Sequence, residues 1–150
     1  MTRTLYTLLV GIDNYPPPIP TLCGCANDVR RMQALLQVRA GEQNMDLQQV
    51  VLLDGSATRA AVVDGFRTHL VQAGPDDTVL FYYSGHGSQM RDVHGDEEDG
   101  MDETILPHDT RDPGRQVFDI TDDEIKEWLD ALVAKTDNVV LLFDCCHSAS

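Results

Sequence analysis

A cysteine and a histidine each follow an apolar segment of the chain, where they could carry out nucleophilic chemistry. Val139–Phe143 leads within three residues to Cys146, and Val79–Tyr83 leads within three residues to His86. A thiol becomes an effective nucleophile at neutral pH when a neighbouring group supports its thiolate, and imidazole commonly does so. Ligands of open parallel sheets bind beyond the carboxyl ends of the strands. The two segments therefore predict a Cys146–His86 dyad where two parallel strands end.

The elements that must position this dyad alternate between strand and helix patterns. Short apolar runs predict strands, and apolar residues at helical spacing predict helices. Thr121 to Glu124 has the form of a capping box, and Thr58 is a predicted N-cap. The predicted strands are 5–12, 48–53, 78–83 and 138–143, and the predicted helices are 27–38, 58–73 and 121–135. This alternation predicts an α/β fold with a mostly parallel sheet covered by helices on both faces, in one domain over residues 1–150.

Composition narrows the classes of partner. The net charge of −14 argues against nucleic acid and anionic membranes, and favours cations or basic substrates. No apolar stretch approaches the roughly 20 residues that span a bilayer, and the start of the chain does not have the pattern of a secretory signal. The four cysteines form two close pairs whose spacing does not suit disulfides. We therefore expect a cytoplasmic protein with reduced thiols.

Two segments resist assignment to a helix or strand, residues 14–24 and an acidic loop over residues 85–118. Nine carboxylates lie between Asp92 and Asp112, which is unfavourable unless solvent or a cation relieves their repulsion. Calcium fits best, because it takes several oxygen ligands in flexible geometry and the loop offers no thiolate for softer metals. The spacing is not that of an EF-hand loop.

Three motifs occur in order along the chain: Tyr83–Ser88, Gly95–Glu103 and Asp144–Ser148. Together they closely resemble the metacaspases and their bacterial relatives, the orthocaspases, which are cysteine peptidases of the caspase-like fold. The resemblance runs from the first predicted strand to the last residue. It implies a caspase-like three-layer sandwich whose further strands, the small-subunit region, would follow Ser150. We therefore expect these residues to be the large-subunit catalytic region of a longer or processed protein.

The resemblance also implies roles for the residues of the dyad. Cys146 would be the nucleophile, and His86 would act as general base and then as general acid toward the leaving amine. The backbone N–H groups of Gly87 and Cys146 would form the oxyanion hole. Cys145 is expected to be a structural thiol, and we expect the glycines beside His86 to allow a sharp turn.

Substrate specificity is implied by four further positions. Asp28 and Asp144 match the acidic pocket residues of the family, and Cys25 and Ser84 match the rest of the pocket wall. This pocket would bind Arg or Lys before the scissile bond of a protein or peptide substrate. Asp28 has an alternative interpretation as an acidic residue that stabilises the first turn of a helix.

Calcium and self-processing also follow from the resemblance. Asp102, Asp122 and Asp123 match residues that bind an activating calcium ion in metacaspases. Asp122 and Asp123 equally suit the first turn of a helix. Arg111 and Arg115, in the acidic loop, are candidate sites of self-cleavage, and so are positions that would follow Ser150.

Three other functions remain as alternatives. The domain could be a caspase-like regulator or scaffold that retains the dyad without turnover, and Ala149 stands where the family usually has glycine. Adjacent cysteines could bind zinc or act in redox chemistry, although their spacing is unusual for either. Asp54, with Asp13 nearby, could be the phosphate acceptor of a receiver domain, which would leave His86 unexplained.

Overall fold

A six-stranded sheet with helices on both faces organises the residues that the structure describes. The computed structural model describes residues 2–91, 101–112 and 114–147, with the main chain alone at 90, 91, 101, 146 and 147. Its elements in chain order are β1 (Thr4–Gly11), α1 (Cys25–Glu42), β2 (Asp46–Leu53), η1 (Asp54–Ser56), α2 (Arg59–Asp64), η2 (Gly65–His69), η3 (Leu70–Gln72), β3 (Thr78–Arg91), β4 (Met101–Ile105), β5 (Ile120–Thr121), α3 (Asp122–Val133) and β6 (Asn138–His147).

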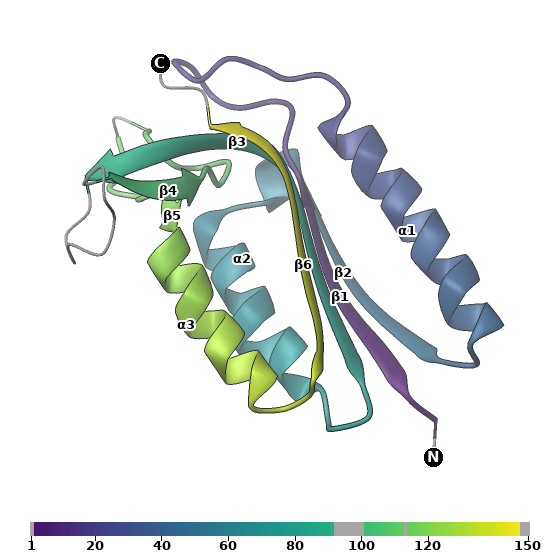
Figure 1. The fold of residues 1–150 in the computed structure, drawn as a ribbon. Helices are drawn as coiled ribbons and strands as arrows, with labels where there is room; N and C mark the ends of the chain where they lie inside the picture. Colours follow the sequence, from purple (N-terminus) through teal and green to yellow (C-terminus); the bar gives the residue numbers. More distant parts are fainter. Residues whose placement is uncertain (1, 92–100, 113, 148–150) are drawn as a thin grey trace.

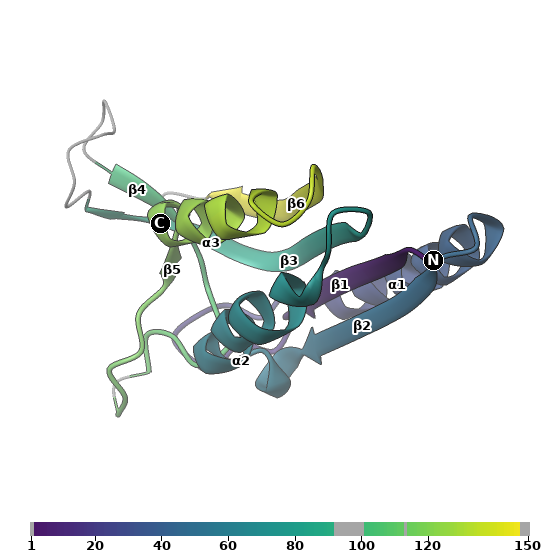
Figure 2. The ribbon, with the colours of Figure 1, turned by 90° about the horizontal axis from the view of Figure 1, so that it is seen from below.

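The strands form a parallel sheet with an antiparallel extension. β1 pairs in parallel with β2 and β3, and β3 pairs in parallel with β6. β4 pairs antiparallel with β3 and β5. Figures 1 and 2 both show β4 and β5 beyond the carboxyl ends of β1 and β2. The prediction of a mostly parallel α/β sheet is confirmed.

The central strands β1 and β3 are buried on both faces of the sheet, as their apolar runs predicted, whereas β6 keeps exposed apolar side chains. Side chains alternate along β3: Val79 and Phe81 belong to one apolar cluster, and Leu80 and Tyr82 pack in another. Phe66 and Trp128, from the α2 and α3 side, stack in the first cluster with their ring centroids 4.8 Å apart. α1 packs in the second cluster, and Figure 1 shows it on the face opposite α2 and α3.

The helices begin close to where the sequence predicts and differ in their extent. Thr121 accepts a hydrogen bond from Glu124 N–H in a complete capping box, and Thr58 accepts one from Ala61 N–H. The helix that follows Thr58 is not α-helical throughout, because α2 continues as one turn of π-helix and a short 3₁₀ turn. α1 begins two residues before the predicted start, at Cys25. A Cβ on Gly11 would lie 2.7 Å from a Val29 side-chain carbon, so glycine lets α1 approach β1 closely.

The predicted end of the third strand is wrong. The sequence Ser84–Gly87 suggested a turn, but β3 stays extended through it to Arg91. Part of the acidic loop is therefore sheet, since β3 continues to pair with β4 up to the Arg91–Met101 pair. The expected sharp turn beside His86 is absent, and its flanking glycines do not have positive φ angles.

Candidate active site

His86 lies at a break in the sheet. On one side of β3, its pairing with β1 ends at Ser84 and its pairing with β4 begins at Gly87. On the other side, β6 pairs with β3 without interruption, and the register sets Cys146 directly opposite His86. The structure thus brings the main chains of the two dyad residues together across 60 residues of sequence. The side chain of Cys146 lies outside the described part of the chain.

Two buried tyrosines fill the break and hold the main chain of His86. The Tyr15 hydroxyl accepts a hydrogen bond from His86 N–H at 3.0 Å and donates to the Leu106 carbonyl at 2.9 Å. The Tyr83 hydroxyl donates to the His86 carbonyl at 2.6 Å. A Cβ on Gly85 would lie 2.7 Å from both hydroxyl oxygens. Glycine is needed at position 85 for this close approach and not for a turn.

Burial keeps both hydroxyls protonated. Desolvation raises the pKa of Tyr15 to about 12 and the pKa of Tyr83 well above its ordinary value. Both phenols therefore remain donors at neutral pH. The Tyr15 ring also packs against the imidazole of His86, with 4.9 Å between the ring centroids.

The imidazole of His86 has a fixed partner that the sequence did not suggest. Its Nε2 lies 2.8 Å from the carbonyl oxygen of Pro20, in the loop between β1 and α1. A carbonyl only accepts, so this hydrogen bond requires the proton on Nε2. In the neutral ring, Nδ1 then carries the lone pair that can accept a proton from a thiol.

The four predicted pocket residues line a single cavity. Cys25 and Asp28 from α1, Ser84 from β3 and Asp144 from β6 surround about 300 Å³ of space that also reaches His86. Tyr82 donates to the Asp144 carboxylate at 3.5 Å. Burial, together with the nearby charges of Asp13 and Asp28, raises the pKa of the Cys25 thiol to about 11, so the thiol stays protonated at neutral pH. The cavity is negatively charged and open to a positive ligand.

Asp13 fixes the wall of this cavity from the loop side. Its carboxylate accepts from the N–H groups of Cys25 at 2.8 Å and Ala26 at 3.1 Å, at the start of α1. Burial raises the pKa of Asp13, but these N–H donors outweigh it and leave the pKa below its ordinary value. Asp54 accepts in turn from the N–H groups of Asp13 and Asn14. Both carboxylates thus hold loop backbone, which accounts for them without a phosphate-acceptor role.

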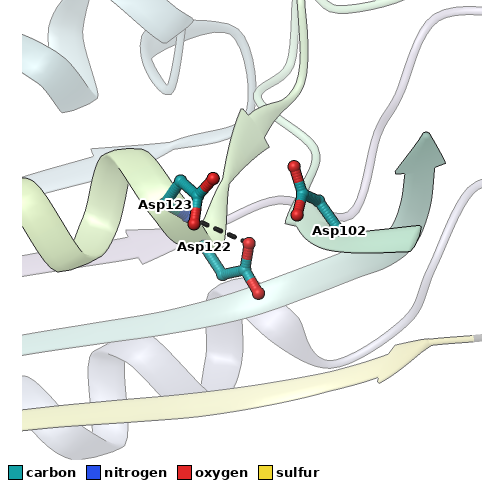
Figure 3. A group of neighbouring side chains, drawn as sticks. All are labelled: Asp102, Asp122 and Asp123. Atoms are coloured by element: carbon teal, nitrogen blue, oxygen red, sulfur yellow. Dashed lines mark hydrogen bonds between the residues drawn. The ribbon is translucent and has the colours of Figure 1, made fainter. Parts of the chain in front are cut away.

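A second group of carboxylates converges away from this cavity. Asp102 on β4 and Asp122 and Asp123 in the first turn of α3 each place a ligand oxygen within 4.8 Å of the others. Figure 3 shows these three side chains as neighbours from β4 and α3. Asp102 is only 2 % exposed. Asp122 also accepts from Asp123 N–H at 2.9 Å, so the first-turn role that the sequence suggested is present as well. We call this group the Asp102 cluster.

The remaining predicted residues fall in several places. Gly87 lies on β3, paired with both Ile105 and His147. Cys145 packs against the larger apolar cluster and also lines the acidic cavity. Residues 95–100 of the second motif and Ala149 lie outside the described residues. Of the helices that are described, none is both long and apolar enough to cross a membrane.

A parallel sheet covered on both faces, with histidine and cysteine in register near its carboxyl end, defines the class of caspase-like α/β domains. Residues 6–150 match the family model of the metacaspase peptidase C14 domain. The chain belongs to the metacaspase family.

Individual relatives agree with this assignment. The chain is 40 % identical over 147 residues to Metacaspase-1 of Schizosaccharomyces pombe. The matched region covers 94 % of this chain and 33 % of that protein. It is 37 % identical to Metacaspase-1 of Ajellomyces capsulatus over 95 % of the chain and 40 % of that protein. A crystal structure of a Geobacter sulfurreducens protein superposes with a TM-score of 0.75 at 28 % identity, over 98 % of this chain and 52 % of the other. The chain thus spans well under half the length of these curated relatives.

The hydrogen-bond partners of His86 were not predicted from the sequence, because both lie in a segment without a helix or strand pattern. Tyr15 and Pro20 lie in residues 14–24, a segment that carries neither helical nor strand periodicity. They are 71 and 66 residues from His86 in the sequence. Tyr15 and Pro20 contact His86 only when this loop folds over β3.

Proposed function

We propose that this chain is the catalytic region of a cysteine endopeptidase that cleaves peptide bonds after Arg or Lys. One observation carries the proposal: the register of β3 and β6 sets His86 opposite Cys146, at the edge of a cavity that contains two carboxylates. Membership of the metacaspase family supports the same reaction class.

His86 would handle the protons of the reaction. With Nε2–H donating to Pro20, Nδ1 accepts the thiol proton of Cys146, and the thiolate attacks the carbonyl carbon of the substrate. The C–N bond breaks as His86 returns this proton to the leaving amine, which leaves a thioester. Water then loses a proton to His86 and attacks the thioester, whose C–S bond breaks to free the acid and the thiol. The N–H groups of Gly87 and Cys146 would stabilise the oxyanion.

The acidic cavity supports specificity for a basic residue. Asp28 and Asp144 reach it from α1 and β6, so two carboxylates face the same space from different elements. A guanidinium can pair with both through its fork of N–H donors, and the ammonium of Lys can pair with them as a point charge. Both Arg and Lys would be accepted, with Arg bound more tightly because it offers more donors.

Calcium would act at the Asp102 cluster. Calcium–oxygen distances of about 2.3–2.6 Å allow ligand oxygens to lie up to roughly 5 Å apart, and the three carboxylates meet this condition within 4.8 Å. When bound, the ion would neutralise carboxylate repulsion and tie β4 to α3. β4 pairs with the part of β3 that follows His86, which offers a structural basis for stimulation.

The outer edge of β6 supports association with a small-subunit region of the same protein. Among the described strands, β6 pairs with β3 alone. Val140, Leu142 and Phe143 on it are 39–43 % exposed. An unpaired edge with exposed apolar side chains suits a further strand. If self-processing occurs in the loop, Arg115 is the better site, because Arg111 is tied to the buried Asp119 at 2.8 Å.

The test uses the full-length protein with fluorogenic peptides that end in Arg, Lys or Asp, with and without millimolar calcium. We expect calcium-stimulated hydrolysis after Arg and Lys, none after Asp, and loss of all turnover in Cys146→Ala. A folded protein that hydrolyses none of these peptides, and whose Cys146 does not react with an electrophile, would overturn the proposal in favour of a regulatory scaffold.

A further inference from the structure

His86 borders two cavities, and only one of them is the acidic cavity described above. The second, of about 260 Å³, is lined in part by Ile19, Pro20, Leu106 and Arg111 together with His86. Along β3, Ser84 and Gly85 line the acidic cavity, Gly87 and Ser88 line the second, and His86 lines both. β3 therefore passes from one cavity to the other at His86, the residue that would transfer protons in the reaction.

We propose that the second cavity binds the side chain that follows the scissile bond of the substrate. This inference rests on the proposed function. A substrate that places its basic side chain in the acidic cavity has its scissile carbonyl beside His86 and Cys146. The leaving amine must then lie within reach of the imidazole, because His86 protonates it. The substrate residue that carries this amine then lies beyond His86, where its side chain can enter the second cavity.

The walls of this cavity combine apolar residues with the polar residues His86 and Ser88 and with one fixed cation, Arg111. Ile19 and Pro20 come from the loop between β1 and α1, and Leu106 directly follows β4. Arg111 is held in place, because its Nη2 lies 2.8 Å from the carboxylate of Asp119, which is 4 % exposed. Asp119 also accepts from the hydroxyls of Thr104 and Thr110. The Arg111 side chain nevertheless stays 40 % exposed, so part of its guanidinium remains open to a ligand.

These walls select the chemical class of the residue after the cleaved bond. Apolar walls stabilise an aliphatic side chain by removing it from water. The guanidinium attracts a carboxylate and repels a basic side chain at this position. The protein would therefore cleave Arg–Leu and Arg–Glu bonds in preference to Arg–Lys bonds. The acidic cavity favours a basic side chain and the second cavity disfavours one. A substrate with basic residues on both sides of the scissile bond would therefore be cleaved poorly.

The experiment measures kcat/KM of the full-length protein on internally quenched peptides that differ only after the Arg, with Leu, Glu, Ala or Lys at that position. We expect Leu and Glu to exceed Lys by about tenfold, since an exposed charge contact contributes up to about fivefold and buried methylenes add more. Arg111→Gln should reduce the ratio of Glu to Lys by about fivefold, and Arg111→Lys should restore it. Ile19→Ala should reduce the ratio of Leu to Ala.

The matched control is Arg39→Gln, which removes an equal charge from an ion-paired side chain that is 64 % exposed near the end of α1 and does not line the cavity. It should leave every ratio unchanged. Equal rates on all four peptides, or a ratio of Glu to Lys that Arg111→Gln does not alter, would overturn the inference while cleavage after Arg still stands.

A measurement of peptide affinity tests the same cavity without turnover. Fluorescence anisotropy of the four labelled peptides with the Cys146→Ala protein should give the same order of affinity. A Lys peptide that binds as tightly as the Leu peptide would overturn the inference. Absence of cleavage of every Arg peptide by the unmodified protein would instead count against the proposed function.

Discussion

Two groups of carboxylates in this protein are built differently. Asp28 and Asp144 line a cavity of about 300 Å³ from two different elements, α1 and β6. The members of the Asp102 cluster converge to within 4.8 Å, and Asp102 itself is buried. Carboxylates spread around an open space suit a long organic cation that enters from solvent. Carboxylates that meet at a point suit a compact metal ion.

We infer from this difference that the elements carrying the aspartates determine whether they suit a basic side chain or a metal ion. The cavity carboxylates come from the start of helix α1 and from strand β6. The Asp102 cluster joins a short strand to the first turn of α3, where a helix N-terminus already favours negative charge. Substitutions in each group should therefore have separable effects.

The largest expected effect is on cleavage after Arg. Asp28→Asn or Asp144→Asn should each lower kcat/KM for an Arg peptide by about 10- to 100-fold, because a hydrogen bond to a charged group contributes about 1.5–3 kcal/mol. Thermal unfolding should be almost unchanged. The control is Asp64→Asn, an exposed acid on α2. Full activity in both cavity variants would show that these carboxylates do not bind the substrate.

The next effect concerns calcium and stability. At a hundredfold excess over its Kd, calcium should stabilise the full-length protein by about 2.7 kcal/mol, since it binds the folded state. Asp102→Asn combined with Asp123→Asn should abolish this gain in calorimetry. Without calcium, the same variant should be more stable than the parent, because it relieves repulsion between carboxylates. A calcium-dependent rise in Tm that persists in the variant would place the ion elsewhere.

A smaller effect is expected on the thiol of Cys25, which reports the charge of the cavity. Its pKa lies at about 11 from burial first, and the negative charge of Asp28 adds to the rise. Removing that charge favours the thiolate, so Asp28→Asn should lower this pKa. The pH dependence of Cys25 alkylation, followed by mass spectrometry in a Cys146→Ala background, measures it. Asp102→Asn should leave this pKa unchanged.

The smallest expected effect is the coupling between the two groups. The double variant Asp28→Asn with Asp102→Asn should show the sum of the single effects on ΔG‡, within about twofold in kcat/KM, as independent sites do. The calcium-induced rise in Tm should be the same in Asp28→Asn as in the parent. A larger deviation in either measurement would mean that the cavity and the cluster communicate.

Much of this arrangement followed from local sequence. The apolar runs marked the four parallel strands, and the capping box at Thr121 marked the start of α3. The motifs around His86 and Cys146 predicted residues that the register of β3 and β6 indeed sets side by side. The strands and the cap depend on neighbours within a few positions, which a sequence displays directly. The placement of His86 beside Cys146 followed instead from the rule for parallel sheets and from the family resemblance.

The features that the sequence did not predict depend on distant partners. Ser84–Gly87 has the composition of a turn, yet it remains a strand because β6 pairs with it along its length. The polar residues of β4 looked like part of a loop, since their pairing partner on β3 was itself unassigned. The contact between His86 and Pro20 forms only when residues 12–24 fold over the sheet.

The break in the sheet beside His86 also affects the exchange of a single proton. The amide hydrogen of His86 bonds to the Tyr15 hydroxyl and not to a neighbouring strand. Its exchange with deuterated solvent therefore requires the loop to lift away, whereas amides paired between strands require the sheet itself to open. Since the same loop carries Pro20, each such opening also releases the imidazole. The rate of amide exchange at one residue would thus report the free energy needed to open the candidate active site.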